Sequence, residues 1–98
     1  MPRVPNPIGI ETDQSERQAE MTPAQCRAAR GLLDWSQAKL AEAAGLSLST
    51  VVKFERSGRA GAAGAVPTIK RTLESAGVEF ISENGSGAGV RFMKGKLN

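Results

Sequence analysis

The first run of regularly spaced apolar residues lies between positions 23 and 33. Thr22 followed by Pro23 is a helix-start signature, because a proline at the first helical position gives up no hydrogen bond. The apolar residues that follow repeat with the period of one helix face, at Ala24, Ala28, Ala29, Leu32 and Leu33. This pattern predicts a helix that ends near Leu33, weakened at Gly31 by about 1 kcal/mol relative to alanine.

A second, shorter helix is predicted over residues 37–44. Ser36 is a favoured capping residue, and Gly45 can end the helix because glycine adopts the left-handed conformation without strain. The apolar stripe of this helix consists of Leu40, Ala41 and Ala44. A helix of about two turns is unstable in isolation, so a neighbouring element has to cover this stripe.

The next stretch, GLSLSTVVKFERSG, has conflicting local preferences. Its middle is rich in β-forming residues, namely Val51, Val52 and Phe54. Its ends carry Ser47 and Gly58, which are typical of the start and the end of a helix. A strand would alternate polar and apolar residues, and Val51 breaks that alternation. A helix over residues 48–57 places Val51 and Phe54 on one face, so the sequence favours a helix that follows a three-residue turn.

The C-terminal third predicts one more helix and a β-hairpin. The helix starts near Val66 or Pro67 and ends at Gly77, with an apolar stripe made of Ile69, Leu73 and Ala76. Apolar and polar residues then alternate on both sides of the glycine-rich segment SENGSGAG, at Val78, Phe80, Val90 and Phe92. The expected fold is mainly α: four helices with a C-terminal β-hairpin. Because an isolated hairpin is marginal, it must pack on the helices or pair with another chain.

The first 20 residues differ in character from the rest of the chain. They contain three prolines followed by a polar run, and such a segment buries too little apolar surface to fold. Met21 is a candidate alternative start, which the sequence alone does not decide. We therefore expect three parts: a disordered arm over residues 1–20, a helical domain over 21–77, and a hairpin with a tail over 78–98.

The composition leaves little equipment for catalysis. The chain has no histidine, and Cys26 is its only cysteine. It therefore cannot form a cysteine–histidine metal site or a nucleophile–histidine pair. A single cysteine cannot form an internal disulfide, which suits a reducing cytoplasm. No apolar run approaches the roughly 20 residues of a membrane span. We expect a cytoplasmic protein that is not an enzyme and that binds no cofactor, metal, membrane or evident small molecule.

Charge is unevenly distributed along the chain. Residues 1–20 carry two basic and four acidic side chains, whereas residues 21–98 carry 11 basic and 6 acidic side chains, a net charge of +5. A small basic domain without catalytic groups favours a polyanion as its partner. Charge alone does not separate this interpretation from ordinary solubility.

The stretch MTPAQCRAARGLLDWSQAKLAEAAGLSLSTVVKFERSG resembles the Xre-type, lambda-repressor/Cro-like helix-turn-helix domains, and the resemblance extends to about residue 77. It is most specific in Ser-Gln at a helix start, Leu-Ala one turn later, Ala-Gly at the turn, Ser at the next cap, and an aliphatic-x-x-Phe-Glu run before glycine. The resemblance implies binding to double-stranded DNA, with helix 48–57 in the major groove and the preceding helix across the backbone.

The resemblance also assigns roles to single residues. Gln37 would bind a phosphate, the alternative being a helix-capping glutamine without a partner. The base-reading surface would comprise Leu48, Ser49, Thr50, Val52 and Lys53. The other candidate DNA contacts are Lys39, Ser47, Arg56 and Arg59, the two arginines being phosphate contacts or else solvated charges.

Two apolar residues of the reading surface have alternative roles. Leu48 cannot hydrogen-bond, so it touches a thymine methyl group or docks on a protein partner. Val52 lies one residue away from the Val51/Phe54 face and is either exposed to a thymine methyl group or partly buried in the core.

Two structural roles follow from the resemblance and the apolar pattern. Arg30 in the first helix and Glu55 near the end of helix 48–57 match an ion pair that holds the reading helix in place. Trp35 is expected to pack between the first two helices as core, the alternative being stacking on a sugar or base of DNA.

The function expected is that of a sequence-specific transcriptional regulator, a repressor rather than an activator. Such proteins usually dimerise and read half-sites about 34–36 Å apart. The candidate dimer element is the hairpin over residues 78–93, unless it serves only to cover the helices. One alternative is an antitoxin or controller protein of a small operon. The other is a protein-interaction adaptor that uses the helix-turn-helix core.

Overall fold

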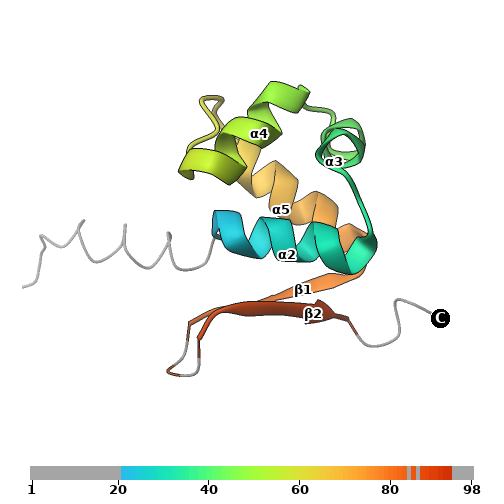
Figure 1. Ribbon diagram of the computed structural model, residues 1–98, viewed down its shortest axis with the longest axis vertical. Helices are drawn as coiled ribbons and strands as arrows, with labels where there is room; N and C mark the ends of the chain where they lie inside the picture. The colour runs from blue at the N-terminus through green and yellow to red at the C-terminus, as the bar shows by residue number, and fades with distance from the viewer. Residues whose placement is uncertain (1–20, 84, 86, 94–98) are drawn as a thin grey trace, which may run out of the picture.

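The computed structural model describes residues 21–83, 85 and 87–93 of the 98-residue chain. The predicted arm over 1–20 and the end of the predicted tail lie outside these residues. The described elements are α2 (Pro23–Leu33), α3 (Gln37–Ala44), α4 (Leu48–Ser57), α5 (Ala65–Ser75), β1 (Val78–Ile81) and β2 (Gly89–Phe92). The hairpin lies on the opposite side of α2 from α4 (Figure 1). The predicted fold class, mainly α with a C-terminal hairpin, is confirmed.

The helix ends follow from side-chain caps that the sequence supplies. In α2, the Thr22 hydroxyl accepts from the Gln25 backbone N–H at 3.1 Å, and the Gln25 side chain accepts from the Thr22 N–H at 2.9 Å. This reciprocal arrangement is a capping box, and it satisfies two backbone donors that the helix leaves free. Ser36 and Ser47 cap α3 and α4 in the same sense, each accepting from the N–H three residues later.

Residues 48–57 form a helix in spite of their β-forming side chains. Val51 and Phe54 are completely or almost completely buried, on the face of α4 that packs against α2 and α3. Full burial of an aliphatic or aromatic side chain contributes about 1.5–3 kcal/mol. The whole β-propensity scale spans about 1 kcal/mol, so tertiary packing decides the conformation.

Two details of the predicted helices are wrong. Ala24 and Ala28 are exposed, and the buried face of α2 is instead formed by Gln25, Cys26 and Ala29. Spacing among alanines identifies a helix but not its inner face, because alanine is tolerated on either side. Helix α5 begins at Ala65 rather than at residue 66 or 67, which places Pro67 inside the first turn, where its missing N–H leaves no helical hydrogen bond unmade.

The hairpin pairs Val78 with Phe92 and Phe80 with Val90 in an antiparallel register. Val78 is completely buried, and Phe80 and Val90 pack against the helical core. The opposite face carries the exposed cross-strand pair of Glu79 and Arg91, with Arg91 Nε 3.0 Å from Glu79 Oε1. The hairpin therefore covers the lower side of the helices, while its role in dimerisation stays a prediction.

Candidate nucleic-acid interface

Helices α3 and α4 are joined by the tight turn Gly45-Leu46-Ser47. Gly45 has φ 70°, a left-handed conformation that favours glycine, and the next N–H, that of Leu46, donates to Ala41 O at 2.9 Å. Leu46 is half-buried against the core, and Ser47 begins α4 as its cap. This turn fixes the angle between two short helices, so the position of α4 depends on what holds its far end.

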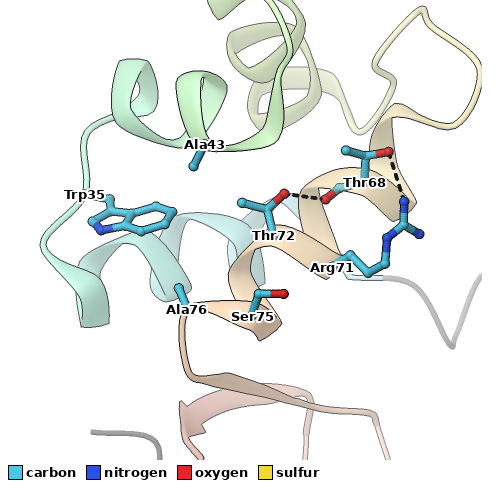
Figure 2. A pocket seen from close by; sticks show the side chains of 7 residues that line it. All are labelled: Trp35, Ala43, Thr68, Arg71, Thr72, Ser75 and Ala76. Carbon is cyan, nitrogen blue, oxygen red and sulfur yellow. Dashed lines mark hydrogen bonds between the residues drawn. The ribbon is translucent and has the colours of Figure 1, made fainter.

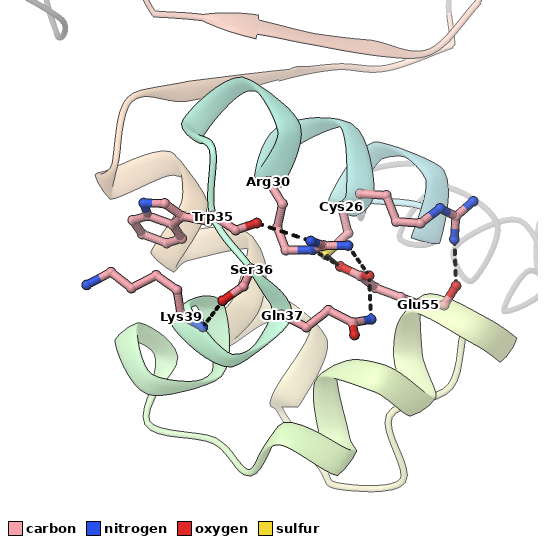
Figure 3. Close-up of polar contacts among 8 residues, drawn as sticks. Cys26, Arg30, Trp35, Ser36, Gln37, Lys39 and Glu55 are labelled. Atoms are coloured by element: carbon pink, nitrogen blue, oxygen red, sulfur yellow. Dashed lines mark hydrogen bonds and ion pairs between the residues drawn. The ribbon is translucent and has the colours of Figure 1, made fainter.

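The far end of α4 is held by Glu55, whose carboxylate is buried and fully engaged (Figure 3). Arg30, the partner that the resemblance implied, donates from Nε to Oε2 at 2.7 Å and from Nη2 to Oε1 at 2.8 Å. The Cys26 thiol donates to Oε2 at 3.0 Å, and Gln37 Nε2 donates to Oε1 at 3.0 Å. One carboxylate thus joins α4 to α2 and to the first turn of α3.

The hydrogen bonds around Glu55 decide its charge state. Burial by itself would raise the pKa of Glu55, but donation from Arg30, Cys26 and Gln37 outweighs burial and holds the pKa below the ordinary glutamate value. The same pairing raises the pKa of Arg30. Burial, and then the hydrogen bond to Glu55, raises the pKa of the Cys26 thiol, so this cysteine is an unreactive donor rather than a nucleophile.

Gln37 is neither a free phosphate ligand nor a glutamine without a partner. Its amide nitrogen donates one hydrogen to Glu55, and the side chain is half-buried at the start of α3. A primary amide carries two hydrogens and an accepting oxygen, so one donor remains for a second partner. The contact with Glu55 orients this amide in advance.

The first turn of α4 presents hydroxyl groups and one apolar side chain. Ser47 Oγ lies 3.1 Å from Ser49 Oγ and 2.8 Å from Thr50 Oγ1. Leu48, between them in sequence, is 48% exposed. Val52, one turn further along, is half-buried, which agrees with the partial burial that was one of its two alternatives, while its contact with DNA stays a prediction.

Exposed cations lie on α3, on α4 and just after α4. Lys39 on α3, and Lys53, Arg56 and Arg59 in and after α4, all lie at the surface. Lys39 Nζ lies 5.7 Å from the centre of the Trp35 ring, a cation–π distance. Lys53 folds back toward the loop after α4, since a Cβ built on Gly61 would lie 2.9 Å from its Nζ. In this conformation the ammonium rests beside the loop rather than beside the first turn of α4.

The family model described as "Helix-turn-helix" matches residues 27–60, which contain most of α2, all of α3 and α4 and the turn between them. Residues 27–60 form a helix-turn-helix domain of the lambda-repressor (Xre-like) type. This family consists of DNA-binding regulators and is not typically enzymatic. A search of curated proteins finds no match to the chain. No helix in the described part of the chain is long and apolar enough to cross a bilayer.

Three residues that support the helix-turn-helix domain escaped the sequence analysis. Cys26 completes the Glu55 cluster, and Arg27 Nη1 donates to the Glu55 backbone carbonyl at 2.6 Å. Nothing in their spacing identifies these two. Gln25 Nε2 donates to Ile81 O at 3.1 Å and to Gly89 O at 2.9 Å, so it ties α2 to both strands. The Thr-x-x-Gln pattern at the start of α2 is a capping-box signature and gave a usable signal for Gln25.

Trp35 lies at the edge of the core rather than within it. It is half-buried against the core and lines a surface groove of about 420 Å³ together with Ala43, Thr68, Arg71, Thr72, Ser75 and Ala76 (Figure 2). The groove lies between the α2–α3 connection, α3 and α5. Within the residues that the structure describes, no group of three or more metal-ligating side chains is assembled there or elsewhere.

Proposed function

We propose that this protein is a sequence-specific transcriptional repressor that inserts the N-terminal half of α4 into the major groove of its operator. The observation that carries the proposal is the asymmetry of α4. Its C-terminal half is fixed by the buried Glu55 cluster, whereas at its start Leu48 and the hydroxyl-bearing Ser47 and Ser49 are exposed to solvent. A rigidly held helix with an exposed N-terminal turn is the arrangement by which helix-turn-helix proteins reach base edges.

Phosphate contacts would set the register of the domain on DNA. The N-terminus of α3 offers backbone N–H groups and the second amide hydrogen of Gln37. Lys39, Lys53, Arg56 and Arg59 are exposed cations on α3, on α4 and just after α4, and are the candidate phosphate contacts. Each phosphate neutralised should contribute about −0.9 to the slope of log K against log salt. Such contacts position the domain, and the exposed turn of α4 supplies the sequence preference.

We propose further that two copies act together, as a homodimer formed through the hairpin, and that they act on the nucleoid in the cytoplasm. One domain offers few base contacts, and two reading helices one helical turn of DNA apart multiply them. The hairpin lies on the side of α2 away from α4, so a contact through it leaves the reading surface free (Figure 1). Repression would follow from occupancy of a promoter. An operon antitoxin or controller protein would bind its own promoter in the same way.

The decisive experiment is selection of bound sequences from a random double-stranded DNA pool with the full chain. A palindromic consensus supports both DNA reading and dimerisation, and a single unrepeated site supports reading by a monomer. Affinities for the selected site are then measured across a salt series for the wild type, Gln37→Ala and Lys53→Ala. The matched control is Arg71→Ala, which removes one exposed cation from α5, outside the α3–α4 pair.

The expected result is that Gln37→Ala and Lys53→Ala weaken binding, with a shallower salt slope for Lys53→Ala, while Arg71→Ala leaves it unchanged. The competing function is that of a protein-interaction adaptor that uses the helix-turn-helix core, with the exposed Leu48 as its candidate contact. Failure to enrich any sequence, together with indifference to salt, overturns the DNA-reading proposal in favour of the adaptor.

A further inference from the structure

The leucine at the start of α4 lies outside the hydrophobic core. Among the described residues the exposed large hydrophobic side chains are Leu48 and Phe92. Phe92 belongs to the inner face of the hairpin and is opposite Val78 in the register, whereas the buried face of α4 is supplied by Val51, Phe54 and Glu55. Leu48 therefore leaves about half of its surface in water without contributing to the core of the fold.

The surroundings of Leu48 are poor in groups that read bases by paired hydrogen bonds. Bidentate recognition of guanine or adenine requires arginine, asparagine, glutamine or a well-placed lysine. The first turn of α4 contains none of these, and its hydroxyls at Ser47, Ser49 and Thr50 are already linked to one another or to the helix cap. The nearest cation on the helix, Lys53, rests beside Gly61. The first turn of α4 would therefore present mainly the methyl groups of Leu48 to the major groove of DNA.

Val52 extends that surface. It follows Leu48 by four residues, so the two side chains are neighbours along one side of α4, and Val52 is half-buried. Together they form a short apolar strip that runs from the exposed tip of the helix toward the core. A small apolar group held against the strip would be contacted by Leu48 and backed by Val52.

The major groove presents one apolar group on its base edges, the methyl group at C5 of thymine. A cytosine methylated at C5 presents the same group at the same place. We propose that Leu48 is the specificity-determining residue of the reading helix, and that it recognises the C5 methyl group of a pyrimidine in each half-site. This inference rests on the proposed function, because it assumes that α4 enters the major groove.

The test removes single methyl groups from the DNA and leaves every hydrogen-bonding group in place. In the selected operator, each thymine is replaced in turn by deoxyuridine, and each cytosine by 5-methylcytosine. Dissociation constants are measured by fluorescence anisotropy at one fixed salt concentration for the wild type, Leu48→Ala and the control Arg71→Ala, which lies on α5 outside the reading surface. Thermal unfolding of each variant verifies that the half-exposed substitution leaves the fold intact.

We expect one thymine in each half-site whose methyl group, when removed, weakens wild-type binding about four-fold, the factor for returning one such group to water. Removing the methyl group in both half-sites should weaken binding about 16-fold. If Leu48 instead faces a cytosine in each half-site, replacing that cytosine by 5-methylcytosine should strengthen binding by a similar factor. The two outcomes distinguish thymine from methylated cytosine as the source of the methyl group. Leu48→Ala should bind more weakly and lose this discrimination, and Arg71→Ala should keep both the affinity and the discrimination of the wild type.

Two results overturn the inference while the proposed function stands. One is an operator that is bound with the same affinity whichever methyl group is removed or added. The other is a Leu48→Ala variant that discriminates as strongly as the wild type. By contrast, selection that enriches no DNA sequence removes the proposed function itself, and this inference with it.

Discussion

Removing Arg30 should destabilise the protein more than removing the charges of both Arg30 and Glu55. In the native protein the Glu55 side chain is 3% exposed and the Arg30 side chain 18% exposed, with Nε and Oε2 2.7 Å apart. Arg30→Ala withdraws two of the four side-chain donors from a carboxylate that water cannot reach. Arg30→Ala combined with Glu55→Gln leaves no buried charge behind.

The magnitudes follow from the geometry of the pair. Breaking a buried ion pair by removing one partner costs about 3–5 kcal/mol. Because Arg30 is partly exposed and the donors Cys26 and Gln37 remain, we expect the lower end, about 3 kcal/mol, for Arg30→Ala. Glu55→Gln leaves an arginine that can reach water and should cost less, about 1.5 kcal/mol, as for a lost hydrogen bond to a charged group. The double variant should recover about 2 kcal/mol relative to the sum of the singles, within the usual range for contacting residues.

The assay is urea unfolding of the full chain at pH 7 for the four proteins of the cycle, followed by far-ultraviolet circular dichroism. In thermal scans, the loss of about 3 kcal/mol lowers Tm by at least about 12 °C for a domain of this size. If Arg30→Ala is unfolded in buffer, all four proteins are compared in the same concentration of a stabilising osmolyte, which restores a measurable transition. Additive single effects, with no coupling between the two positions, refute the reasoning.

Two further predictions concern Glu55 and Gln25. The pKa of Glu55 lies below its ordinary value of 4.5, so the unfolded chain takes up the proton first as the pH falls. The stability that Glu55 contributes is therefore present above about pH 4.5 and is lost as the pH drops through the native pKa. Urea titrations at pH 3–7 should show a smaller loss of stability in acid for Glu55→Gln than for the wild type, and an equal loss would contradict the assignment. Gln25→Glu keeps the acceptor that caps α2 but places an anion against the carbonyl oxygens of Ile81 and Gly89. Amide hydrogen exchange should therefore become faster in the hairpin and stay slow in α4. If exchange in the hairpin is as slow as in the wild type, Gln25 does not hold the hairpin on α2.

The helices could be predicted from the sequence because residues next to each end, the capping serines and glycines, determine where the helix starts and stops. Ser36, Ser47 and Gly58 act within one turn of their own positions, so no tertiary information is needed to interpret them. The helical state of residues 48–57 required one further step. The apolar pair Val51 and Phe54 had to be weighed against β-propensity, and the spacing of the pair was sufficient.

What the sequence did not predict depends on contacts between distant segments. Cys26 reads as a small apolar residue, and only the fold brings its thiol to a carboxylate 29 residues away. Gln25 likewise binds carbonyl groups 56 and 64 residues further along the chain. The orientation of α2 was wrong at Ala24 and Ala28 for a related reason: an alanine-rich helix has no strongly marked apolar face until its neighbours are known.

The Glu55 cluster connects two parts of the interface that sequence motifs treat separately. Gln37 is the candidate phosphate contact, and α4 is the candidate reading helix. The Glu55 carboxylate, which is part of α4, accepts a hydrogen bond from Gln37 and so links the two. Under the proposed function, a change at Glu55 therefore moves the phosphate contact and the bases read by Leu48 relative to one another. Since such backbone contacts fix the register of α4 on DNA, a substitution at the buried Glu55 should change sequence preference under the proposed function.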